Sequence, residues 1–127
     1  MARFTNGLWR GLTRRWVGYV FLVFMAAATP ALAQSVLDAG RWLAEQAYQL
    51  SRETSGERDP RTLTNLNNLA MLYFIQGRYG EAEPRLKEAL QLRREVLGPR
   101  HPDTLTSLNN LALLYLHQGR YGEAEPI

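Results

Sequence analysis

The phrase NNLAMLYFIQGRYGEAEP, which begins at Asn67, returns almost unchanged 42 residues later as NNLALLYLHQGRYGEAEP. Residues 59–85 agree with residues 101–127 at 20 of 27 positions, which excludes chance similarity. A weaker match at the same spacing links residues 47–56 with residues 89–98. A period of this length is typical of repeat architectures, in which each repeat covers the apolar face of its neighbour.

The spacing of the copies divides the chain into segments. Residues 34–56 are the second helix of a degenerate repeat, residues 57–98 form a complete repeat, and residues 99–127 form a truncated one. Residues 1–33 do not take part in the repeat and have a different composition.

Each repeat predicts two helices. Apolar residues at steps of three and four place one face of the first helix inward, and the same spacing holds in the second helix. Asp59 and Pro60 suit a helix start, Gly77 suits a helix end, and Pro84 allows at most a slight bend. The inner face of the first helix comprises Leu63, Leu66, Leu69, Ala70 and Tyr73, and that of the second comprises Ala82, Leu86, Ala89, Leu90, Val96 and Leu97.

The segment upstream predicts a further second helix over residues 35–54. It begins with a capping box from Ser35 to Asp38, and its inner face carries Leu43, Ala47 and Leu50. A helical hairpin of this size cannot bury its apolar surface alone, whereas stacked hairpins can. The sequence therefore predicts an all-α fold: helical hairpins stacked as an alpha solenoid that is incomplete at the C-terminus.

The segment LGPRHPDTLTSLNNLALLYLHQGRYGEAEP, from Leu97 to Pro126, resembles the tetratricopeptide repeat, in the 42-residue variety of kinesin light chains and their bacterial relatives. The resemblance is strong over residues 56–127 and weak over residues 35–55. It departs from the shorter standard repeat at Leu66 and Leu86, where aromatic residues are common. It implies an interaction scaffold that binds a peptide or partner protein on a concave face lined by the first helices.

Four asparagines lie on those first helices: Asn67, Asn68, Asn109 and Asn110. An amide side chain offers both a donor and an acceptor, so a row of amides can bind an extended peptide backbone. We expect these side chains to face a partner together with Met71, Ile75, Leu113 and His117. The alternative is that one asparagine of each pair bridges adjacent repeats.

The N-terminal segment has the features of a secretory signal peptide, namely arginines without acids, an apolar run from Trp16 to Ala28, and small residues at Ala31 and Ala33. Cleavage after Ala33 would give an exported chain that starts at Gln34, periplasmic or secreted. The alternative is an uncleaved inner-membrane anchor, for which a run of 13 residues is short.

Composition narrows the function classes. The four arginines of residues 1–33 account for the basic balance, since the rest of the chain holds 11 basic and 12 acidic residues. We therefore expect no nucleic-acid surface. The chain has no cysteine, and His117 has no second ligand at metal-binding spacing. We expect no metal, no cofactor and no catalytic site.

Two other functions stay open. The chain could be the targeting and repeat region of a longer enzyme, for example a caspase-like peptidase. A stripe of tyrosines and Trp42 could bind a membrane, although helix packing accounts for that stripe equally well. Few residues follow Tyr121, so Leu108, Leu111 and Tyr115 should lack a covering second helix and either stay exposed or drive self-association.

Overall fold

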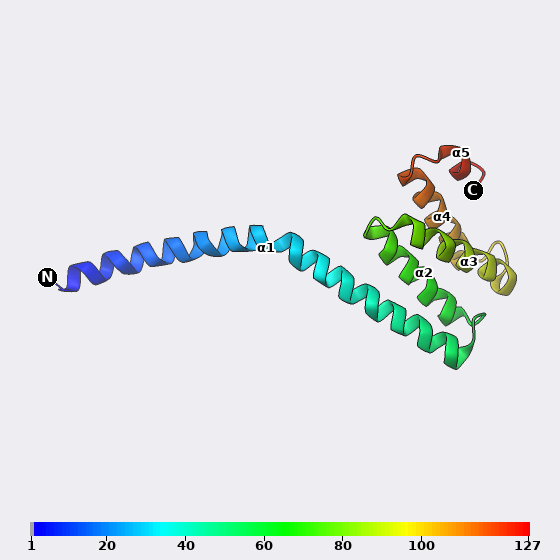
Figure 1. The fold of residues 1–127 in the computed structure, drawn as a ribbon, viewed down its shortest axis with the longest axis horizontal. Coiled ribbons are helices and arrows are strands. Elements are labelled where there is room, and N and C mark those ends of the chain that lie inside the picture. The colour runs from blue at the N-terminus through cyan, green and yellow to red at the C-terminus, as the bar shows by residue number, and fades with distance from the viewer. Residues whose placement is uncertain (1) are drawn as a thin grey trace. The chain divides into compact units, whose positions relative to one another are not determined.

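The computed structural model of the chain describes the backbone of residues 2–127 and the side chains of residues 19–20 and 29–127. All regular secondary structure over this range is helical, which confirms the all-α prediction (Figure 1). The helices are α1 (Ala2–Ser55), α2 (Pro60–Ile75), α3 (Tyr79–Leu97), α4 (Pro102–His117) and α5 (Tyr121–Ala124). Two compact units divide the chain, Met1–Val36 and Leu37–Ile127, and the second contains the repeats.

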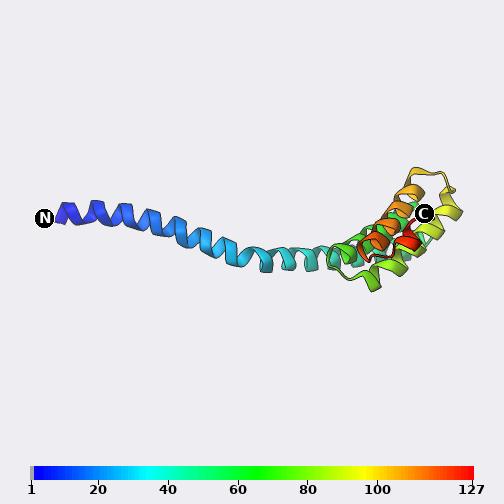
Figure 2. The same ribbon diagram turned by 90° about the horizontal axis from the view of Figure 1, so that it is seen from above.

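In the second unit α3 packs on both first helices, α2 and α4, so the three lie side by side (Figures 1 and 2). Their inner faces share one apolar core, to which α1 adds a single buried tyrosine. The buried members are Tyr48, Leu66, Leu69, Ala70, Tyr73, Ala82, Leu86, Ala89, Leu90, Leu111, Leu114 and Tyr115. All five residues predicted for the inner face of α2 are buried, as are the first four predicted for α3.

Glycines end the helices where the repeat predicts. Gly77 and Gly119 follow α2 and α4 with φ of 73° and 71°, a left-handed conformation that strains any residue with a Cβ. Their backbone amides bond back to carbonyls of the last turn, at 2.9 Å and 3.1 Å. This closure turns the chain into the next helix, because the left-handed residue satisfies the last carbonyls.

The starts of α2 and α4 use different caps at equivalent positions. Asp59 Oδ1 accepts the backbone N–H of Arg61 at 2.8 Å, as predicted, while His101 Nδ1 accepts that of Asp103 at 3.1 Å. Pro60 and Pro102 occupy the first helical position. The imidazole nitrogen of His101 therefore caps α4 in the way that the carboxylate of Asp59 caps α2.

Replacing His101 tests this cap. His101→Ala should lower the free energy of unfolding by about 1 kcal/mol, and His101→Asn should keep it or raise it by a few tenths, because asparagine is among the strongest N-caps. Thermal unfolding followed by circular dichroism measures both variants. Equal melting temperatures for wild type and His101→Ala would show that the imidazole contributes nothing.

The predicted helix start at Ser35 is wrong. α1 runs through Pro30 and Ser35 without a break. No glycine lies between Pro30 and Leu37 to take the left-handed conformation that ends α2 and α4. The lost hydrogen bond at Pro30 is thus tolerated instead of ending the helix.

The predicted inner face of this helix is also wrong. Leu43, Ala47 and Leu50 are exposed, and the residues that face α2 are Ala44, Tyr48 and Ser51. The expected inner face is the one that α3 turns toward its own first helix. The structure packs no first helix against it in the described unit Leu37–Ile127.

The side chains of the predicted signal-peptide core, from Trp16 to Ala28, lie largely outside the described residues. Within the described part of the chain, no helix combines the length and the apolar character needed to cross a membrane.

Candidate protein-binding face

One surface of α2 and α4 carries most of the residues predicted to bind a partner. Steps of four, three and four residues place them in two parallel rows. We call this surface the α2–α4 face; its residues are Thr64, Asn68, Met71 and Ile75 on α2 and Thr106, Asn110, Leu113 and His117 on α4. Six of the eight are exposed, and Met71 and Asn110 are half-buried.

The two rows are joined by Asn67, which lies beneath the face. Asn67 is only 6% exposed, and its Oδ1 accepts hydrogen bonds from Asn110 Nδ2 at 3.2 Å and from Ser107 Oγ at 3.5 Å. Asn67 and Asn110 therefore have intramolecular partners, as the bridging alternative predicts for one asparagine of each pair. These two bridge adjacent repeats.

The other two asparagines behave differently. Asn68 and Asn109 are exposed, and neither amide side chain makes a hydrogen bond to another described residue. Asn109 is the copy of Asn67, so it occupies the position that would accept bonds from a following repeat. Each pair thus contains one engaged amide and one open amide, but the engaged one is the first of the pair in α2 and the second in α4.

Apolar side chains lie beside the open amides. Ile75, Leu113 and Leu116 are exposed, although aliphatic groups of this size favour burial. His117 meets Phe74 edge to face across the two repeats, with ring centroids 5.0 Å apart. The α2–α4 face therefore combines hydrogen-bonding amides with apolar contact area, which is the chemistry that an extended peptide requires.

A buried arginine that the sequence pattern did not single out lies beneath the face and supports it. Arg93 of α3 is 4% exposed. Its Nη1 donates to Ser107 Oγ at 2.8 Å and to the carbonyl of Asp103 at 3.0 Å, and its Nη2 donates to Thr64 Oγ1 at 3.3 Å. Burial lowers the pKa of this guanidinium, which remains charged because arginine titrates far above neutrality.

At the equivalent place, the preceding junction between repeats uses other residues. Arg93 corresponds to Ser51, and Ser107 corresponds to Asn65. Asn65 Nδ2 donates to Ser51 Oγ at 3.0 Å and to the carbonyl of Ala47 at 3.3 Å. In both junctions a longer donor faces a serine hydroxyl. The donor lies on the second helix in one junction (Arg93) and on the first helix in the other (Asn65). The paired change was the signal in the sequence that could have identified this contact.

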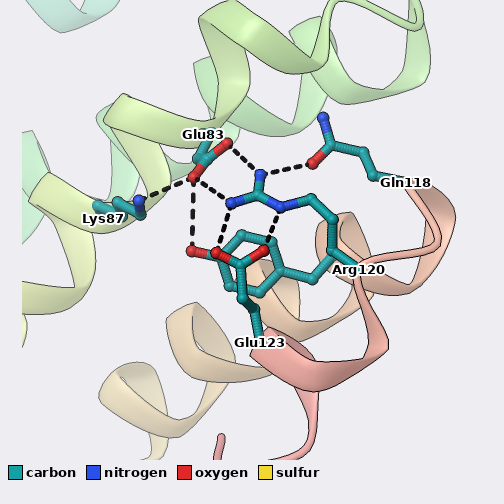
Figure 3. Close-up of polar contacts among 6 residues, drawn as sticks. Glu83, Lys87, Gln118, Arg120 and Glu123 are labelled. Carbon is teal, nitrogen blue, oxygen red and sulfur yellow. Dashed lines mark hydrogen bonds and ion pairs between the residues drawn. The ribbon is translucent and has the colours of Figure 1, made fainter.

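A second polar cluster joins the repeats at the opposite ends of α2 and α4. Arg78 stacks on Tyr73 at 4.8 Å, and Arg120 stacks on Tyr115 at 4.5 Å. Arg120 also contacts Glu83, Gln118 and Glu123, as Figure 3 shows.

The acidic residues that accept hydrogen bonds from the two tyrosine hydroxyls do not occupy equivalent positions of the repeat. Tyr73 donates to Glu45 and Tyr115 donates to Glu83, each at 3.5 Å, but Glu45 corresponds to Lys87. The hydrogen bonds from Arg120 and then from Lys87 lower the pKa of Glu83, so its carboxylate is ionised in the folded chain. The charges are thus rearranged between junctions while the tyrosine contact is kept.

The arrangement as a whole is suited to binding. Among the residues whose side chains are described, no group of three acidic or histidine side chains is placed to hold a metal ion. The polar clusters join helices to one another, whereas the α2–α4 face keeps exposed amide and apolar side chains, among them Asn68, Ile75 and Leu113.

Comparison with known proteins agrees with this reading. A search of curated proteins finds no match to the chain. The family model of the tetratricopeptide repeat matches residues 31–93 and again residues 61–127, which together cover most of the chain. Proteins built from this repeat generally mediate contacts between proteins. The chain therefore belongs to the tetratricopeptide repeat family.

Proposed function

We propose that the α2–α4 face binds an extended segment of a partner protein, and that the repeats are of the 42-residue variety described above. The observation that carries the proposal is the open amide of Asn68 beside exposed Ile75 and Leu113 on this face, with the open amide of Asn109 next to the face, on the side of α4 that points away from α2. Amides recognise a peptide backbone regardless of its sequence, and apolar residues select among its side chains. The family's general role in protein contacts supports the same reading.

The bridging amides would hold this face in shape. Asn67, Ser107 and Arg93 link α2, α3 and α4 by hydrogen bonds that are largely out of water. A rigid pair of helices loses little conformational freedom when a ligand binds, which favours affinity. We therefore propose that Asn67 and Asn110 hold the helices in place, and that Asn68 and Asn109 contact the partner.

A peptide selected against the purified chain from a displayed random library provides the probe. The variant Asn68→Ala/Asn109→Ala should bind that peptide roughly tenfold more weakly, because each lost hydrogen bond contributes about 0.5–1.5 kcal/mol. Its melting temperature should be unchanged or slightly higher, since both residues are exposed on helices and alanine is the better helix former. Isothermal titration and circular dichroism give the two readings.

Asn67→Ala is the matched control. It removes the acceptor for Asn110 and Ser107, so we expect a lower melting temperature. Unchanged affinity in the Asn68→Ala/Asn109→Ala variant would contradict the proposed contact. If no substitution on the α2–α4 face, Leu113→Ala included, changes the affinity for the selected peptide, the peptide binds elsewhere.

A further inference from the structure

An open groove of about 540 Å³ runs between α3 and α4, on surfaces that the α2–α4 face does not use. Its lining residues are Lys87, Leu90, Gln91, Arg94, Glu95 and Leu111. Its floor is apolar because Leu90 and Leu111 belong to the core, and its rim is charged. None of the polar clusters described above fills it.

The repeat shows what occupies the equivalent place one repeat earlier. Leu90 corresponds to Tyr48 and Leu111 to Leu69. Both of those residues lie in the core cluster with Ala82, Leu86 and Ala89 of α3. The surface formed by α1 and α2 is thus covered by α3, the second helix of a hairpin. The groove lies on the equivalent surface of α3 and α4, and no such helix covers it in this structure.

The first helix of the truncated repeat shows the same vacancy. Leu105 is 50% exposed, whereas its copy Leu63 is 0% exposed. Leu108 and Ala112 are half-buried, whereas their copies Leu66 and Ala70 are buried. α5 supplies one turn of a second helix, which ends at Ala124. In this structure α4 is therefore a first helix against which only one turn of a second helix packs.

The other end of the repeat array has the complementary vacancy. Residues 41–55 of α1 correspond to residues 83–97 of α3. Leu43 and Leu50 are 60% and 62% exposed, and Ala47 is exposed where its copy Ala89 is fully buried. This part of α1 is therefore a second helix whose first helix is missing.

We propose that a second copy of this chain inserts residues 41–55 of its α1 into the groove between α3 and α4, so that two copies complete one hairpin between them. The template is the packing of α3 on α2 and on the part of α1 that contains Tyr48. In that template Arg85 and Glu88 of α3 lie near Tyr48, whose pKa is raised chiefly by burial. The corresponding residues of α1 are Leu43 and Gln46, which suit the apolar Leu90 that replaces the tyrosine.

The contact has a defined symmetry. One copy contributes its groove and the other its α1, so the interface is heterologous and each copy keeps one unused surface. Addition of further copies produces open chains, and the mean mass rises with concentration. α5 and residues 125–127 occupy the places equivalent to residues 37–43 of the incoming α1, and Ala124 and Ile127 pack against the core there. The proposal requires this short segment to give way to the longer incoming helix.

Two variants disable the two surfaces separately. Leu43→Glu/Leu50→Glu removes the apolar side of α1, and Leu105→Glu places a charge on α4 where the incoming helix packs. All three leucines are exposed, so each variant should keep the helical circular dichroism spectrum of the wild-type chain. Arg61→Glu, which introduces the same acidic side chain on an exposed residue of α2 that lies neither in the groove nor on α1, is the control.

Sedimentation velocity over a hundredfold range of concentration measures the result. The wild type and Arg61→Glu should grow beyond the dimer, and each of the other variants should associate at least tenfold more weakly and stay monomeric over this range. An equimolar mixture of the two disabled variants should form a one-to-one dimer and stop there, since one retains the groove and the other retains α1.

Three outcomes would overturn the proposal. One is a wild-type chain that stays monomeric throughout, and another is a closed wild-type dimer that Leu105→Glu leaves intact, which would indicate that α1 pairs with α1. The third is a mixture in which both variants remain monomers.

Discussion

Leu63→Ala should lower the free energy of unfolding by about 2–5 kcal/mol, while Leu105→Ala should lower it by about 1 kcal/mol or less. The two leucines are copies at the same position of the repeat, but Leu63 is 0% exposed and Leu105 is 50% exposed. Truncating the first removes buried methyl groups and leaves a cavity. Truncating the second removes groups that water already reaches. A domain of ordinary stability, about 5–15 kcal/mol, would lose a large part of it to Leu63→Ala alone.

Urea unfolding at low protein concentration, where the chain is a monomer, gives the comparison. At high concentration Leu105→Ala should instead weaken association, because the proposed incoming helix packs against Leu105. The pair therefore separates stability within one chain from stability gained between copies. Equal losses for both variants at low concentration would mean that α4 is covered in solution as fully as α2.

The period and the apolar spacing were enough to predict most of the fold. All residues assigned to the inner face of α2 are buried, because steps of three and four place them on one side of any helix. The cap at Asp59 and the left-handed Gly77 also follow from local chemistry, which acts within a few residues and therefore appears in the sequence.

The errors concern contacts between elements. Leu111 and Tyr115 were expected to lack cover, yet both are buried, because α3 covers one side of α4 and Arg120 stacks on Tyr115. Leu43 and Leu50 carry the pattern of an inner face but have no first helix against them in the second unit. Amphipathic spacing shows which side of a helix is apolar, but it does not show whether another helix is present to bury it.

The asparagine pairs show a similar limit. Asn67 and Asn68 are adjacent in the sequence and identical in type, yet only Asn67 is buried between repeats. The difference of about 100° between neighbouring positions on a helix decides which amide meets the next repeat. The sequence supported both the bridging and the binding reading, and the structure shows bridging for Asn67 and Asn110. Contact with a partner by Asn68 and Asn109 stays a prediction.

Arg93→Ser should lower the free energy of unfolding by about 2–3 kcal/mol, and the added change Ser107→Asn should restore at least about 1 kcal/mol of it. Arg93 makes three hydrogen bonds to neutral oxygens in the junction between repeats, and serine at that position reaches none of them. The double variant recreates the previous junction, in which Asn65 donates to Ser51 and to the carbonyl of Ala47. Ala89 already stands at the position equivalent to Ala47.

Ser107→Asn alone completes the cycle. Ser107 is fully buried against Arg93, so the larger amide has no room and should cost about 1–3 kcal/mol. The four chains, unfolded in urea under identical conditions, give a coupling energy between the two positions, for which we expect about 1–3 kcal/mol in favour of the matched pairs. Additive losses would show that the two junctions differ by chance. A clear coupling would show that the repeats exchange one polar pair for another, and that each junction tolerates only its own combination.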